Sequence, residues 1–240
     1  MHQQLSKLKY AAILLTAVLA PTSAVQAATL TTKTYDSSVA VQRTDYDAFL
    51  DLQQFDSTLG DLQSIELALL GEVNGKIELE SRDASPATVT GNLKAEITLK
   101  NPDNSTLLVA LPTASETKNF TPYDGVLDFD GTSGATLAGL KSVDSKSKTL
   151  TDTSTFAPFI GTGKVKLPVS AIGKSEATGK GNLVAGFETL AGANVRVVYT
   201  YLKKVEEPPK KKVPESQLPA GVLAAMGLGM VVTRKFRQQA

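Results

Sequence analysis

Apolar and polar residues alternate along much of the chain between residues 29 and 202. The clearest case is the segment 87–100, where apolar residues fall on odd-numbered positions and polar residues on even-numbered ones. A period of two residues predicts a β-strand with one buried face and one face toward solvent. The apolar positions of this strand are Val89, Leu93, Ala95, Ile97 and Leu99.

The same alternation recurs after turn signals. The sequence Asn-Pro-Asp-Asn at 101–104 predicts a turn, and no helical period of useful length occurs in the body, where residues 51–60 hold one helical turn at most. Many short strands rich in Thr, Ser and Gly predict an all-β fold, an antiparallel β-sandwich of the jelly-roll or Ig-like type. The further predicted strands cover residues 106–111, 164–169, 183–187 and 195–201.

Asn74-Gly75 lies between two apolar alternations, and this dipeptide is a strong signal for a two-residue hairpin turn. Such a turn would pair Val73 with Lys76 and would place the apolar residues before it on the same face as the glutamates after it. The hydrophobic pattern favours a register shifted by one residue, as a bulge or a longer loop gives. The sequence predicts a hairpin here and leaves its register open.

Residues 1–27 have the pattern of a secretory signal peptide. Two lysines precede a ten-residue apolar run at 11–20, which is too short for a stable membrane span. Val25 and Ala27 place small residues at the −3 and −1 positions of a cleavage site. We expect a signal peptidase to cut after Ala27, so that Ala28 begins the mature chain and residues 28–202 form the β-sandwich domain.

The composition changes twice in the C-terminal part of the chain. Residues 203–217 are rich in charge and proline, which is typical of an extended, semi-rigid linker. Residues 218–233 carry no charge, and as a helix they would extend about 24 Å, a short transmembrane span. A basic cytoplasmic tail, 234–240, follows and would stop transfer. Its basic residues are Arg234, Lys235 and Arg237.

A short motif stands before the apolar run, namely Val213, Pro214, Glu215 and Ser216. The motif, the apolar run and the basic end together resemble the PEP-CTERM sorting signal of exported bacterial proteins. The resemblance implies processing by an exosortase-type sorting enzyme. Ser216 stands where that signal usually has a second proline.

The body carries a series of stretches that fit a second family in their order. They are QFDSTLGDL (54–62), PATVT (86–90), YDGVLDFDGTSGATLAGL (123–140), GTGKVK (161–166), GNLVAGF (181–187) and VYTY (198–201). These stretches look like the choice-of-anchor E domain of exported bacterial proteins. The resemblance covers most of residues 29–201. It implies attachment to an anchoring tail, and it implies no known activity and no catalytic residues.

Several residue types that common catalytic sites need are missing. The chain has no Cys and no Trp, and its one histidine, His2, lies in the predicted signal peptide. A mature chain without imidazole or thiol cannot form Ser-His-Asp or Cys-His catalytic groups. It also lacks the usual ligands of zinc, copper and haem. We therefore predict no enzyme activity and no cofactor.

Charge is distributed unevenly along the chain. Residues 28–202 carry 15 Lys and Arg against 21 Asp and Glu, a net charge of −6, whereas residues 203–240 carry 8 against 3, a net charge of +5. An acidic body argues against a nucleic-acid partner, which requires a basic face. The basic C-terminal part suits a membrane surface.

The densest acidic segment contains Asp124, Asp128 and Asp130. Oxygen ligands at alternate positions can bind calcium, but the spacing does not match the helix-flanked calcium loop, so we favour a turn with solvent-facing carboxylates. Asp128 and Asp130, if they share a strand face, also have a plausible spacing for a glycoside hydrolase. Ser-x-x-Lys occurs at 115–118 and 145–148 without the companion motifs of acyl-transfer enzymes.

These patterns predict an exported bacterial cell-envelope protein. It would be held by one transmembrane helix with the domain outside, or released to the cell surface after C-terminal processing. Its sandwich would be a structural or adhesive module. The alternative is a carbohydrate- or calcium-binding module with extracellular polysaccharide as a partner, and a glycoside hydrolase using the three aspartates is a third hypothesis.

Overall fold

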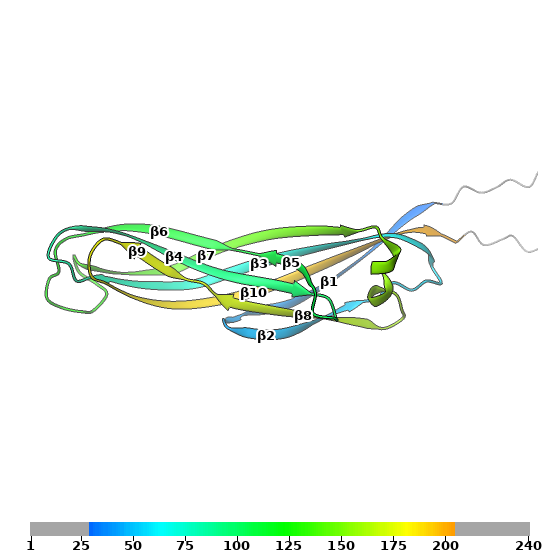
Figure 1. The fold of residues 1–240 in the computed structure, drawn as a ribbon, viewed down its shortest axis with the longest axis horizontal. Helices are drawn as coiled ribbons and strands as arrows, with labels where there is room; N and C mark the ends of the chain where they lie inside the picture. Colours follow the sequence, from blue (N-terminus) through cyan, green and yellow to red (C-terminus); the bar gives the residue numbers. More distant parts are fainter. Residues whose placement is uncertain (1–28, 205–240) are drawn as a thin grey trace, which may run out of the picture. The chain divides into compact units, whose positions relative to one another are not determined.

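The computed structural model describes residues 29–204. Ten strands pair antiparallel in two packed sheets, and two one-turn helices, η1 (Thr153–Thr155) and η2 (Ala157–Phe159), precede β8 (Figure 1). The strands are β1 (Leu30–Arg43), β2 (Tyr46–Gln53), β3 (Gly60–Ser81), β4 (Ala87–Lys100), β5 (Thr106–Ala110), β6 (Thr113–Phe120), β7 (Gly134–Leu150), β8 (Lys164–Gly173), β9 (Glu176–Gly179) and β10 (Leu183–Lys203). The predicted antiparallel β-sandwich is confirmed.

The chain passes repeatedly from one sheet to the other. The first sheet has the strand order β1-β10-β3-β7, and the second has the order β2-β8-β4-β5. Strands β6 and β9 pair with the first half of β4, one on each side of it. The second sheet therefore has six strands, and without β6 and β9 the remaining eight strands follow the order of a jelly roll.

The core lies between the sheets and is built by the period-two pattern. The strand predicted at 87–100 is confirmed with the same bounds as β4, and its five predicted apolar positions are buried. They face the odd-numbered apolar side chains of β3 between Ile65 and Leu79, which are buried as well. Burying apolar side chains from both inner faces is the main favourable contribution to such a fold.

The predicted hairpin at Asn74-Gly75 is wrong, because β3 continues through these residues to Ser81. A Cβ atom on Gly75 would lie 1.8 Å from the Glu188 carbonyl oxygen in β10, so any other residue here would force the two backbones apart. The ladder with β7 shifts register between Gly75 and Ile77. As a single strand, β3 places all its apolar odd-numbered residues on one face, which removes the conflict of register in the hairpin prediction.

The prediction of many short strands is right for β2, β5, β6, β8 and β9 and wrong for the longest strands. β3, β10 and β7 have 22, 21 and 17 residues. The alternations predicted separately at 183–187 and 195–201 both belong to β10. Between them the inward positions are Thr189, Ala191 and Ala193, whose small side chains weaken the apolar signal although they are buried.

The described chain begins and ends at the same end of the sandwich. β1 pairs with β10, and the Lys203 N–H donates to the Thr29 carbonyl at 3.0 Å. The connections β3–β4, β6–β7 and β9–β10 lie at the opposite end (Figure 1). We call these the terminal end and the distal end.

Several predictions concern residues outside the described ones. These are the signal peptide with its cleavage residues Val25, Ala27 and Ala28, the sorting motif at 213–216, the transmembrane helix at 218–233 and the basic tail at 234–240. Within residues 29–204, no helix has the length and apolarity needed to cross a membrane.

Candidate functional site

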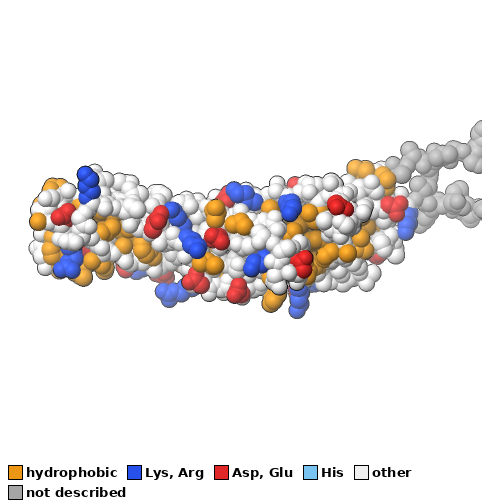
Figure 2. Space-filling view, viewed as in Figure 1, with side chains coloured by type: hydrophobic (Ala, Val, Ile, Leu, Met, Phe, Trp, Pro, Cys, Tyr) orange, Lys and Arg blue, Asp and Glu red, His pale blue; other side chains and the backbone are white. Residues whose placement is uncertain are grey.

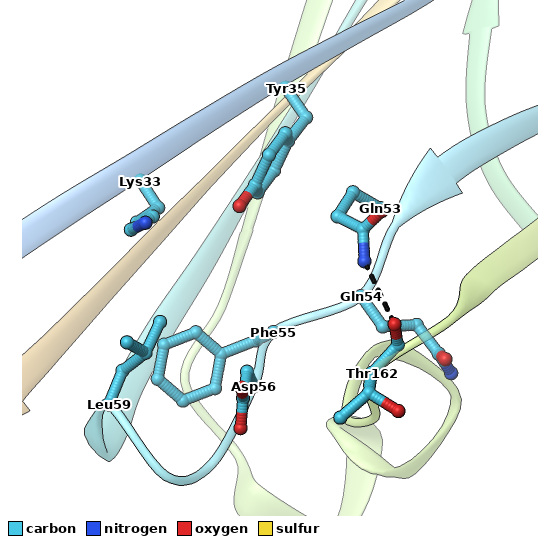
Figure 3. A pocket seen from close by; sticks show the side chains of 8 residues that line it. All are labelled: Lys33, Tyr35, Gln53, Gln54, Phe55, Asp56, Leu59 and Thr162. Carbon is cyan, nitrogen blue, oxygen red and sulfur yellow. Dashed lines mark hydrogen bonds between the residues drawn. The ribbon is translucent and has the colours of Figure 1, made fainter.

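A pocket of about 370 Å³ opens at the terminal end of the sandwich (Figure 3). β1 contributes Lys33 and Tyr35, and Thr162 comes from the turn before β8. The remaining lining comes from the end of β2 and the connection to β3. Those residues are Gln53, Gln54, Phe55, Asp56 and Leu59. The volume falls within the range of sites that hold small ligands.

Hydrogen bonds fix the wall of the pocket before any ligand enters. Gln53 Nε2 donates to the carbonyls of Gly163 (2.8 Å) and Thr162 (3.3 Å). Gln54 Nε2 donates to the carbonyls of Pro158 (3.0 Å) and Ile160 (3.3 Å). Both amide groups therefore use their N–H groups on the protein, while their Oε1 atoms accept no hydrogen bond from residues 29–204.

Aromatic rings form the floor of the pocket. Phe55 is 2% exposed, and its ring centroid lies 5.0 Å from that of Tyr201 and 5.7 Å from that of Tyr199. The Tyr199 hydroxyl donates to the Gln53 carbonyl at 2.9 Å, which ties β10 of the first sheet to β2 of the second. Burial, with a smaller contribution from Tyr35, raises the pKa of Tyr199, so it stays a hydrogen-bond donor. This floor is rigid and uncharged.

Two opposite charges stand at the pocket. Hydrogen bonds from Thr58 lower the pKa of Asp56, and the charges of Lys204 and Lys33 lower it further, so Asp56 is a carboxylate at neutral pH. Lys33 lies on β1, across the pocket (Figure 3). Within the described range of the chain, Lys33 forms no ion pair closer than 4 Å. The pocket therefore offers one cation, one anion and several neutral polar groups.

The three predicted aspartates lie at the distal end, in the β6–β7 connection. Each carboxylate accepts an N–H of its own loop: Asp124 from Val126 (3.0 Å), Asp128 from Asp130 (3.1 Å) and Asp130 from Gly131 (2.8 Å). The premise that Asp128 and Asp130 share a strand face is wrong, because the segment is a loop in which the intervening Phe129 has φ +58°. Among residues 29–204, no group of three acidic or histidine side chains is placed to hold a metal ion.

Glu80 shapes this loop, and the sequence analysis did not single it out. Its side chain is fully buried at the end of β3. One carboxylate oxygen accepts the Ser133 hydroxyl at 2.6 Å, and the other accepts the Phe129 N–H at 2.9 Å. Glu80 falls on a polar position of the alternation, as Glu78 does, so the pattern gave no signal of its burial. Its contacts give it a structural role.

The two Ser-x-x-Lys matches fall on strands β6 and β7. Residues three apart in a strand point to opposite faces, so the serine and lysine of each match are separated by the sheet. Ser115 Oγ instead donates to Asn92 Oδ1 of β4 at 2.6 Å. Neither match forms a serine-lysine pair.

The outer face of the second sheet offers a smaller hollow, of about 190 Å³, beside Phe49 and Pro168. Phe49 is 68% exposed and pairs with Pro168 across the β2–β8 ladder. Further along this face, Thr90 and Thr117 share a hydrogen bond of 2.9 Å. On the face seen in Figure 2, basic and acidic side chains are interspersed, so no patch of one sign stands out there.

Comparisons with known proteins assign no family. No protein-family model matches the chain, and no curated protein matches it. Similar solved structures include the infectious bursal disease virus Gx strain (13% identity, TM-score 0.17, 75% of this chain and 37% of the viral chain). The T13 IBDV viral particle is a second (14% identity, TM-score 0.15, 72% and 36%). The chain spans about a third of those viral chains, and at these TM-scores the likeness supports no conclusion.

The pocket was not predicted from the sequence because its lining comes from three segments that are far apart in the chain. One signal was present. Gln54 stands where the apolar alternation of β2 would continue, just before the buried Phe55. Polar amides at a strand end commonly satisfy backbone groups of a neighbouring loop, and here they do so around a concave surface.

Proposed function

We propose that this chain is an exported cell-envelope protein whose β-sandwich is a non-catalytic structural or adhesive module. One observation carries the proposal: the described chain begins and ends at the terminal end, where Lys203 is hydrogen-bonded to Thr29. A domain tethered through residues after Lys204 would hold this end toward its anchor. The distal end would then be presented outward.

The finer parts of the proposal come from the sequence at both ends. Residues 1–27 direct export and are removed, and residues 218–233 hold the protein in the membrane. The sorting motif before that segment makes the chain a substrate for an exosortase-type enzyme. The linker of lysine, glutamate and proline keeps the sandwich away from the membrane surface.

Fractionation of the cells that produce the protein tests this proposal. With an antibody to the sandwich, we expect the protein in the envelope fraction and, in spheroplasts, accessible to added protease. A variant that lacks residues 11–20 is the matched control and should stay inside and protected. A native protein that is soluble, full-length and protected inside the cell would refute the proposal.

Carbohydrate binding is a second candidate function, and the pocket at the terminal end favours it. The glycoside hydrolase and calcium alternatives gain no such support, because the carboxylates of Asp124, Asp128 and Asp130 hold their own loop together.

A further inference from the structure

We infer that the pocket between β1 and the β2–β3 connection binds a saccharide unit of an envelope or extracellular polysaccharide. The inference rests on the proposed function for the presence of that polysaccharide. The class of ligand follows from the lining alone.

The polar groups of the lining suit a ligand with many hydroxyls. Asp56 and Gln53 Oε1 are acceptors, and Lys33 is a donor. The hydroxyls of Tyr35 and Thr162 can do either. A sugar hydroxyl donates one hydrogen bond and accepts two, so a ring carrying several of them can pair with this mixed set.

The apolar part of the lining suits the carbon face of a sugar ring. Tyr35 and Leu59 bring an aromatic ring and an aliphatic side chain to one space, and the buried Phe55 closes the back of it (Figure 3). The glutamine hydrogen bonds and the Phe55 N–H bond to the Phe159 carbonyl (2.8 Å) hold this space open. A preformed site loses little affinity to ordering on binding.

Other ligand classes fit the lining less well. A phosphate group needs convergent cations, whereas the lining contains one cation, Lys33, and the Asp56 carboxylate would repel an anion. A purely apolar ligand would bury the polar oxygens without partners, which costs binding free energy. The exposed Phe49 on the outer face of the second sheet is the rival saccharide site, with one ring and a smaller hollow.

Saturation-transfer NMR and calorimetry on the full chain in detergent micelles test the inference. The probes are glucose, N-acetylglucosamine and glucuronate, each also as a short oligosaccharide. We expect at least one probe to bind. Tyr35→Phe keeps the ring against Tyr199 and removes the hydroxyl, so Kd should rise about fivefold. Thr162→Trp fills the pocket from an exposed position and should abolish binding.

Two controls separate the possible outcomes. Lys148→Ala, an exposed lysine of β7 outside the pocket, should leave Kd unchanged, and circular dichroism should confirm that each variant is folded. Binding lost with Phe49→Ala and kept with Thr162→Trp would overturn the assignment to this pocket. No binding of any probe by an envelope-located protein would overturn the saccharide inference and leave the proposed function intact.

Discussion

Gly75 is the residue on which the continuity of the longest strand depends. It lies in the middle of β3, where β10 approaches so closely that a Cβ atom would lie 1.8 Å from the Glu188 carbonyl oxygen. Its φ is +153°, at the edge of the region that only glycine adopts freely. The glycine is therefore present for clearance between two strands.

Gly75→Ala should destabilise the fold by more than about 2 kcal/mol, because the backbones of β3 and β10 must separate to admit the methyl group. Gly139→Ala is the matched control. Gly139 has φ +72° in β7, but nothing lies within 4 Å of its Cβ position, so backbone strain alone should cost about 1 kcal/mol. Urea unfolding measures both. Equal losses would contradict the steric explanation.

The same residue explains one failure of the sequence analysis. Asn-Gly is a turn signal because both residues tolerate positive φ, and no local pattern distinguishes a turn from a crowded mid-strand position. The alternation of apolar residues was the better guide, since it continued with the same parity from Leu67 to Leu79. The alternation also predicted β4 with its true bounds, because one face of that strand is buried and the other is partly exposed along its whole length.

At the scale of elements, β7 joins the two sheets at an open side of the sandwich. Asp144 of β7 accepts the backbone N–H of Leu111, just after β5, at 2.8 Å and pairs with Lys146 at 2.7 Å. The side chains of β7 on the face toward β5 are polar because water reaches this side of the sandwich. They are Ser142, Asp144, Lys146 and Lys148. The sequence could not predict this strand for that reason, since its apolar alternation is lost.

The Leu111 N–H bond, and then Lys146, hold the pKa of Asp144 below its usual value. Its stabilising effect is therefore present above the unfolded-state pKa, about 3.9, and is lost as the pH falls through the folded-state pKa. Asp144→Asn should reduce the free energy of unfolding by about 1 kcal/mol at pH 7. The difference from the unmodified protein should be smaller at pH 3 than at pH 7 and vanish below the folded-state pKa of Asp144.

Urea unfolding at the two pH values checks this prediction. Asp51→Asn is the control, because Asp51 is exposed on β2 and makes no hydrogen bond or ion pair with another side chain among residues 29–204. A loss for Asp144→Asn that is as large at pH 3 as at pH 7 would show that the carboxylate charge is not the cause.

The pocket also depends on how strands are arranged relative to one another. The strand patterns predict where individual lining residues lie along the chain. The residues come together only because β1 and β2 are edge strands of different sheets on the same side of the sandwich. The proximity of β1 and β2 is a property of the jelly-roll strand order, and no local sequence pattern indicates it. The candidate site was therefore beyond prediction from the sequence, whereas the β-sandwich was within it.

At the scale of the whole molecule, the first and last strands close the fold together. β1 pairs with β10 over most of its length, from Leu30 opposite Leu202 to Arg43 opposite Leu190. Both ends of the described chain consequently meet at the terminal end, and one tether there leaves the rest of the surface free. Export at one end of the chain and anchoring at the other are compatible with this fold without any rearrangement.

The intact mass of the protein purified from its own cell envelope tests the central claim most directly. The account predicts a chain that begins at Ala28, because residues 1–27 are removed during export. If the sorting enzyme acts, residues C-terminal to the motif at 213–216 are absent as well. A mass that corresponds to all 240 residues, starting at Met1 and recovered from the cytoplasm, would contradict the account.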